Sequence, residues 1–202
     1  MKTTHLEVLV EEQSMEEFLR RVLPKLVPHL TFEVYAHLSK EDLLKNLPRR
    51  LKAYSKWLPE SACILVIVDR DDDDCRKLKT TLEKVAKDSG LSTRTTAGRG
   101  RIRVINRIAI EELESWYFGD WSAVLAAYPK VGATVASKAA YRQPDGIKGG
   151  TWEAFERELQ KAGYFVGGLR KIEAARTIGD HLDPARCKSP SFRALRDALV
   201  AL

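Results

Sequence analysis

Acidic residues follow closely after three apolar segments of the chain. Glu11 follows the first segment, Asp69 and Asp71 follow the most apolar one, and Glu114 comes shortly after the third. Carboxylate oxygens are the ligands that hard cations such as Mg²⁺ prefer, and two carboxylates one residue apart in an extended turn can share one cation. A cation held in this way would neutralise a phosphodiester or activate the water that attacks it.

The apolar segments predict the strands that position these acids. Residues 63–68 (CILVIV) are apolar without interruption, as in a strand buried on both faces of a parallel sheet. Residues 6–10 and 102–110 predict two further strands, and residues 31–36 a fourth. Because the carboxyl ends of parallel strands meet at one edge of a sheet, we expect the four acids to converge there.

Helical periodicity alternates with these strands. It begins near residue 14 and is expected to be stopped by Pro24 and Pro28; it continues over residues 40–58 with an interruption at Pro48, and again over residues 74–89. A strand is also expected soon after Gly90. Strands alternating with helices predict an α/β fold with a mainly parallel sheet flanked by helices. We expect this core over residues 1–118 and a helical C-terminal portion over residues 119–202.

A capping role competes with the metal site for some of the acids. Asp72, Asp73 and Asp74 precede a helix, where carboxylates cap backbone N–H groups, and for these three we favour capping. Asp69 and Asp71 lie closer to the buried strand, so for them we favour metal binding. Capping does not explain Glu11.

Composition limits the classes of function. Lys and Arg outnumber Asp and Glu by 34 to 28, which makes a polyanionic partner plausible. The three cysteines and four histidines lack metal-ligand spacing, so neither a disulfide framework nor a zinc site is indicated. The chain shows no signal sequence and no membrane-length apolar run, and we expect it to be cytoplasmic with no membrane partner.

A strand ending in Glu, followed by a buried strand ending in Asp-x-Asp, resembles the Toprim domain of topoisomerases, primases and the overcoming-lysogenisation-defect (OLD) nucleases. More closely, the chain resembles a Toprim-like prokaryotic family often encoded beside AAA- or ABC-type ATPases in defence loci. The segments that carry this resemblance are VLVEEQS (8–14), VIVDRD (66–71), IEELESWY (110–117), GGTWE (149–153) and SPSF (189–192).

The resemblance implies a nuclease in which Glu11 is the general acid/base or first metal ligand and Asp69 and Asp71 hold Mg²⁺ or Mn²⁺. It implies a further acid, for which Glu114 is the candidate, and a basic residue near the scissile phosphate, for which Lys171 is the candidate. Two positions depart from the pattern: Glu12 replaces the usual glycine, and Met15 stands where the close family often has an acid.

Basic residues form two candidate nucleic-acid contacts. Arg99, Arg101 and Arg103 alternate along the chain and would share one face of a strand, where they would either bind phosphates or protect a solvated sheet edge. Arg176 and Arg186 belong to a second cluster, which includes Lys171. The aromatic side chains of residues 116, 117 and 121 have helical spacing, and for them we favour a place in the core over base stacking.

The leading hypothesis is a metal-dependent nuclease acting on DNA or RNA, the effector of a prokaryotic defence system with an ATPase partner. Two alternatives remain. One is a nucleotidyl or phosphoryl transferase, as in primases, although no P-loop occurs. The other is a catalytically degenerate Toprim module that binds nucleic acid or protein, which Glu12 and Met15 favour.

Overall fold

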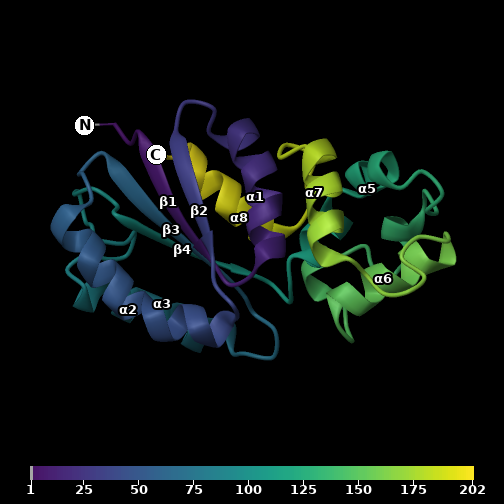
Figure 1. The fold of residues 1–202 in the computed structure, drawn as a ribbon, viewed down its shortest axis with the longest axis horizontal. Coiled ribbons are helices and arrows are strands. Elements are labelled where there is room, and N and C mark those ends of the chain that lie inside the picture. Colours follow the sequence, from purple (N-terminus) through teal and green to yellow (C-terminus); the bar gives the residue numbers. More distant parts are fainter. Residues whose placement is uncertain (1) are drawn as a thin grey trace.

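The computed structural model describes residues 2–202, and four parallel strands form its central sheet (Figure 1). The strands are β1 (His5–Val10), β2 (Thr31–Ala36), β3 (Ala62–Asp69) and β4 (Val104–Ala109), in the order β2-β1-β3-β4. β3 lies inside the sheet between β1 and β4, and all of its residues are buried. The predicted parallel sheet with residues 63–68 in an interior strand is confirmed.

Side chains of β3 alternate between two apolar layers. Cys63, Leu65 and Ile67 belong to one buried cluster, whereas Ile64 and Val66 belong to the other. Successive side chains of a strand point to opposite faces, so a strand that is apolar throughout needs cover on both faces. The free Cys63 thiol is a buried core group with no disulfide partner.

Helices supply that cover on both faces of the sheet (Figure 1). α1 (Gln13–Leu26) and α8 (Pro190–Val200) lie on one face, and α2 (Lys40–Trp57) and α3 (Cys75–Asp88) lie on the other. α1 ends at Leu26, between the two prolines, Pro24 and Pro28, that were expected to stop it. The predicted interruption at Pro48 is wrong, because α2 runs through that residue. Each proline removes one backbone hydrogen bond, and the buried apolar faces of both helices outweigh that loss.

The remaining elements form the predicted helical C-terminal part beside the sheet (Figure 1). They are α4 (Glu114–Gly119), α5 (Trp121–Ala127), the 3₁₀ turns η1 (Val135–Ser137) and η2 (Pro144–Gly146), α6 (Thr151–Lys161) and α7 (Lys171–His181). α7 packs against α1, and α8 returns to β4 in the sheet. Trp116, Tyr117 and Trp121 are buried in the same apolar cluster as Val10, which confirms their expected place in the core. No helix among the described residues is long and apolar enough to cross a bilayer.

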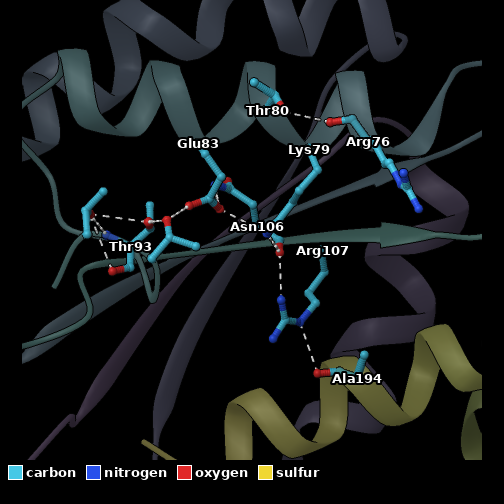
Figure 2. Close-up of polar contacts among 10 residues, drawn as sticks. Arg76, Lys79, Thr80, Glu83, Thr93, Asn106, Arg107 and Ala194 are labelled. Atoms are coloured by element: carbon cyan, nitrogen blue, oxygen red, sulfur yellow. Dashed lines mark hydrogen bonds and ion pairs between the residues drawn. The ribbon is translucent and has the colours of Figure 1, made fainter. Parts of the chain in front are cut away.

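Basic side chains occupy the outer edge of β4 (Figure 2). The backbone carbonyl of Asn106 accepts hydrogen bonds from Lys79 Nζ at 2.7 Å and from Arg107 Nη1 at 3.0 Å. Arg107 Nε also donates to the carbonyl of Ala194 on α8, and Asn106 Nδ2 donates to Glu83 on α3 at 2.9 Å. These bonds tie α3, β4 and α8 together, and they satisfy an edge carbonyl that would otherwise be open to another strand.

Candidate active site

Glu11 and Asp69 stand at the carboxyl ends of neighbouring strands. Val10 of β1 pairs with Ile67 of β3, so Glu11 follows the last paired residue of β1 and Asp69 ends β3. The two residues are only 7% and 5% exposed, and Glu11 Oε2 and Asp69 Oδ1 are both buried without a hydrogen-bond partner. An unpaired buried carboxylate oxygen destabilises the folded protein, because no protein group replaces the water that it has lost.

Glu114 brings a third buried carboxyl group into the same electrostatic environment. It lies in the first turn of α4 and is 1% exposed, and burial raises its pKa to about 7. Burial, with a further contribution from Asp71, also raises the pKa of Glu11 to about 7. Burial first, and then the charges of Glu11 and Glu114, raise the pKa of Asp69 well above its ordinary value. The charges of Glu11 and Glu114 therefore both disfavour the ionisation of Asp69.

Asp71 is held by a lysine that the sequence analysis did not single out. Lys40 Nζ, in the first turn of α2, forms ion pairs with Asp71 and with Asp73 and donates a hydrogen bond to the carbonyl of Asp69 at 3.1 Å. Asp71 also has φ of 46°, a left-handed conformation that is costly for a residue other than glycine. Lys40 thus draws the acidic loop after β3 toward α2 and neutralises Asp71.

The capping prediction for the same loop is confirmed at Asp74. Its carboxylate accepts hydrogen bonds from the backbone N–H groups of Arg76 and Lys77, both at 2.9 Å, at the start of α3. Asp73, for which capping was also favoured, instead pairs with Lys40. Asp69, the last residue of β3, has a buried oxygen without a partner.

Lys171 is the cation on the other side of the carboxyl groups. Burial alone would lower its pKa, but the carboxylates of Glu114 and Glu12 contribute to a net rise. Its Nζ lies 5.4 Å from the centre of the Trp152 ring, a cation–π distance. A cavity of about 470 Å³, lined in part by Glu12, Lys171 and Ile172, opens beside it.

Glu112 connects α6 to the site. Its Oε2 accepts hydrogen bonds from Thr151 Oγ1 at 2.8 Å and from the backbone N–H of Trp152 at 2.9 Å. The carboxylate thereby caps the start of α6 and places the Trp152 ring near Lys171. The segments 110–117 and 149–153 are thus joined through this contact.

Tyr117 contributes a polar group that the sequence analysis assigned only to the core. Its hydroxyl is buried without a hydrogen-bond partner, and burial, followed by the charge of Glu114, raises the pKa of the phenol well above its ordinary value. Glu114 and Tyr117 are three residues apart in one helix, a spacing that puts them on the same face. This spacing in the sequence could have indicated that Tyr117 lies beside Glu114.

The arginines expected to share a strand face lie elsewhere. β4 begins at Val104, later than predicted, and the expected strand after Gly90 is reduced to one isolated bridge at Thr93. Arg101 Nη2 donates to Thr3 Oγ1, and Arg103 Nη2 donates to the carbonyl of Leu58, both at the amino ends of the strands. Arg99 is in the exposed turn before them. The three arginines therefore lie toward the amino ends of the strands, whereas Asp69 lies at a carboxyl end.

Arg176 and Arg186 are engaged in ion pairs away from the carboxyl cluster. Arg176 Nε lies 3.1 Å from Glu17 Oε2 on α1. Arg186 binds the buried Asp120 carboxylate through two nitrogens, with Nη2 2.9 Å from Oδ2. Among the basic residues predicted for the site, the structure places Lys171 beside the carboxylates, whereas Arg176, expected next to it, faces α1.

The chemistry of the donors fits a hard divalent cation, although the side chains are not arranged around one. The candidate ligands are all carboxylates, and the unpaired oxygens of Glu11 and Asp69 are available as two of them. Over residues 2–202, no three His, Cys, Asp or Glu side chains stand close enough together to hold a metal ion. A third carboxylate ligand would therefore require Glu114 to turn toward the pair, or Asp71 to leave Lys40.

Residues 10–200 match the profile of a family described as "Domain of unknown function (DUF4276)". The comparison with curated proteins finds no significant match. Among solved structures, the chain is similar to the C-terminal region of the Xanthomonas campestris pv. campestris OLD protein, with 14% identity and a TM-score of 0.44. That similarity covers 98% of this chain and 95% of the solved one.

Proposed function

The chain belongs to the DUF4276 family, and we propose that it is a Mg²⁺- or Mn²⁺-dependent nuclease that hydrolyses phosphodiesters of DNA or RNA. The observation that carries the proposal is the pair of buried, unpartnered carboxylate oxygens of Glu11 and Asp69 on adjacent strand ends. A bound cation would satisfy both oxygens and remove the repulsion between the two groups. The resemblance of the surrounding motifs to Toprim nucleases supplies the reaction class.

Each residue has a defined part in this proposal. Glu11 and Asp69 would hold the cation, and Glu114 or Asp71 would complete the carboxylate set. The cation, when bound, would neutralise the phosphodiester and lower the pKa of the attacking water. Lys171, which interacts with the charge of Glu114, would oppose the negative charge that develops on the phosphate oxygens. By resemblance, Glu11 would also carry the proton that moves during hydrolysis.

The partner proposed with this activity rests on the resemblance alone. We propose that the nuclease is the effector of a prokaryotic defence system and that an AAA- or ABC-type ATPase controls it. An assay that adds to the purified protein an ATPase encoded beside its gene tests this part separately from the chemistry.

A binding module without chemistry is the second candidate, because Lys40 neutralises Asp71 in the present arrangement. A module of this kind would bind nucleic acid or protein, and its acidic loop would need no cation. The departures at Glu12 and Met15 agree with that alternative.

A cleavage assay distinguishes the two candidates. Single- and double-stranded DNA and RNA are incubated with the protein and Mg²⁺ or Mn²⁺, with and without the neighbouring ATPase. We expect cleavage that Asp69→Asn and Glu11→Gln abolish, together with weaker Mn²⁺ binding in both variants. Asp72→Asn is the matched control, because Asp72 is exposed in the same loop, and it should retain activity. Full activity in Asp69→Asn would refute the proposed nuclease site.

A further inference from the structure

A second cavity with uncompensated positive charge lies in the helical part of the chain. It has a volume of about 460 Å³ and is lined by residues of the α4–α5 junction, of η1, of the segment 141–144 and of the segment 186–188. Its charged lining residues are Asp120, Arg142, Arg186 and Lys188. None of these belongs to the carboxylate site at the strand ends.

The carboxylate of Asp120 cannot neutralise the other cations, because Arg186 and the backbone already engage it. Its side chain is fully buried, its two oxygens bind Arg186, and Oδ2 also accepts the backbone N–H of Asp183 at 2.9 Å. A second ion pair joins Arg186 to Asp183 at 3.6 Å. The pair of Asp120 and Arg186 is therefore internally balanced and fixes one wall of the cavity.

Arg142 and Lys188 carry the charge that remains. Both side chains are exposed, and among residues 2–202 neither has a hydrogen bond or an ion pair with another side chain. Both also line an adjoining cavity of about 320 Å³, whose one acid, Asp145, already accepts hydrogen bonds from Ser189 Oγ and the backbone N–H of Ser191. The two cations thus stand between two cavities with no free carboxylate facing them.

The backbone holds these two residues in place. The N–H of Lys188 donates to the carbonyl of Gly119 at 2.8 Å, and the N–H of Arg142 donates to the carbonyl of Lys138 at 2.9 Å. Gly119 permits the first contact, because a Cβ there would lie 2.6 Å from Cys187 Sγ and 2.9 Å from the backbone nitrogen of Ser189. The cations are therefore presented by fixed backbone, which lowers the entropic cost of binding a ligand.

We propose that this cavity binds the phosphoryl group of a nucleotide unit, through Arg142 and Lys188. Arginine and lysine are the side chains that proteins use for phosphate, arginine as a two-pronged donor and lysine as a point charge. The volume exceeds that of a phosphate and lies in the usual range for small-ligand sites. Aromatic side chains at 118, 121 and 141 line the remaining space. The phosphoryl group belongs to a free nucleotide or to a nucleic-acid strand.

Binding measurements on metal-free protein test the proposal independently of cleavage. In EDTA, inorganic phosphate, a nucleoside monophosphate and a nucleoside triphosphate are titrated by calorimetry, and a fluorescent single-stranded oligonucleotide is titrated by anisotropy. Arg142→Ala combined with Lys188→Ala should weaken binding by about tenfold or more, since charge-assisted contacts contribute on that scale. A variant that keeps a cation at both positions, Arg142→Lys with Lys188→Arg, should retain most of the wild-type affinity.

The control removes the same charge elsewhere. Lys52→Ala with Lys56→Ala deletes two exposed cations of α2, on the opposite side of the sheet, and should leave the affinity within about twofold. Binding of free nucleotides identifies them as the source of the phosphoryl group, and binding of the oligonucleotide alone identifies a nucleic-acid strand. Equal affinity of the wild type and the Arg142/Lys188 variant, or no binding of any probe, would overturn the proposal. Either result leaves the nuclease proposal untested, because EDTA removes the divalent cation on which the proposed cleavage depends.

Discussion

Replacing Glu114 by glutamine tests whether the carboxylate cluster stores unfavourable charge in the metal-free protein. Burial raises the pKa of Glu114 from its ordinary value of 4.5 to about 7, and the side chain is 1% exposed. Because the folded state holds the proton more tightly than the unfolded state, folding is unaffected by this group below about pH 4.5. The penalty grows as the pH rises to about 7 and is complete above it.

The size of the effect follows from the pKa. Each pKa unit corresponds to ~1.4 kcal/mol, so ionised Glu114 destabilises the folded protein by about 3 kcal/mol at pH 8. The attraction of Lys171 already opposes the rise and is included in it. Glutamine has nearly the same shape and no charge, so Glu114→Gln should raise the free energy of unfolding at pH 8 by about 2–3 kcal/mol. At pH 4.5 the two proteins should differ by less than ~1 kcal/mol.

Urea unfolding in EDTA at pH 4.5, 6 and 8 measures this difference. Glu60→Gln is the matched control, because Glu60 is exposed, and it should follow the wild type at each pH. In a second series without EDTA, Mn²⁺ at about ten times its dissociation constant should stabilise the wild type by about 1.4 kcal/mol, and Glu114→Gln should respond less. A variant that is no more stable than the wild type at pH 8 would show that the charge of Glu114 is already compensated within the protein, and the reasoning would fail.

Three further results are expected. Burial alone would raise the pKa of Glu83, but hydrogen bonds from neighbouring donors, among them Thr95 Oγ1 and Asn106 Nδ2, lower it to about 2 (Figure 2). The stabilising contribution of Glu83 is therefore present above about pH 4.5 and is lost as the pH falls toward 2, so Glu83→Gln should lower the free energy of unfolding at pH 7 by about 1–3 kcal/mol and flatten the acid-unfolding curve. Gly119→Ala should destabilise the protein by about 1–3 kcal/mol in urea, because its Cβ would meet Cys187 Sγ at 2.6 Å, whereas Gly167→Ala, which has open space around it, should not. Lys171→Ala should slow cleavage by about 10²-fold or more while Mn²⁺ affinity changes by less than about threefold; an unchanged rate would remove Lys171 from the mechanism.

Features that depend on local sequence were predictable. The uninterrupted apolar run at residues 63–68 identified an interior parallel strand, because only burial on both faces accommodates it. Asp74 was predictable as a helix cap from its position before an amphipathic segment. Pro48 misled the prediction of a helix interruption, since tertiary packing outweighed a local penalty.

Features that depend on contacts between distant segments were not predictable. Lys40 reaches Asp71 across 31 positions of sequence, and nothing around it distinguishes it from other surface lysines. Arg186 was grouped with Lys171 by nearness in sequence, yet its partner Asp120 lies 66 positions away and removes it from the carboxylate site. The alternation of Arg101 and Arg103 indicated a strand face, but the chain turns before β4 begins and directs them to other elements.

Whether each carboxylate at the strand ends has a partner distinguishes a ligand site from a structural cluster. Lys40 compensates Asp71, and two backbone or hydroxyl donors at the start of α6 compensate Glu112. Glu11 Oε2 and Asp69 Oδ1, by contrast, are buried without a hydrogen-bond partner. A binding module could relieve this repulsion by protonation, so Mn²⁺ would not stabilise it and its stability would fall between pH 4.5 and 8 in the same way with or without the cation. In a metal-dependent enzyme, Mn²⁺ should abolish this decrease in stability between pH 4.5 and 8, because the bound cation takes the place of the protons. The unfolding curves therefore decide whether a cation binds, and the cleavage assay then decides whether it serves chemistry.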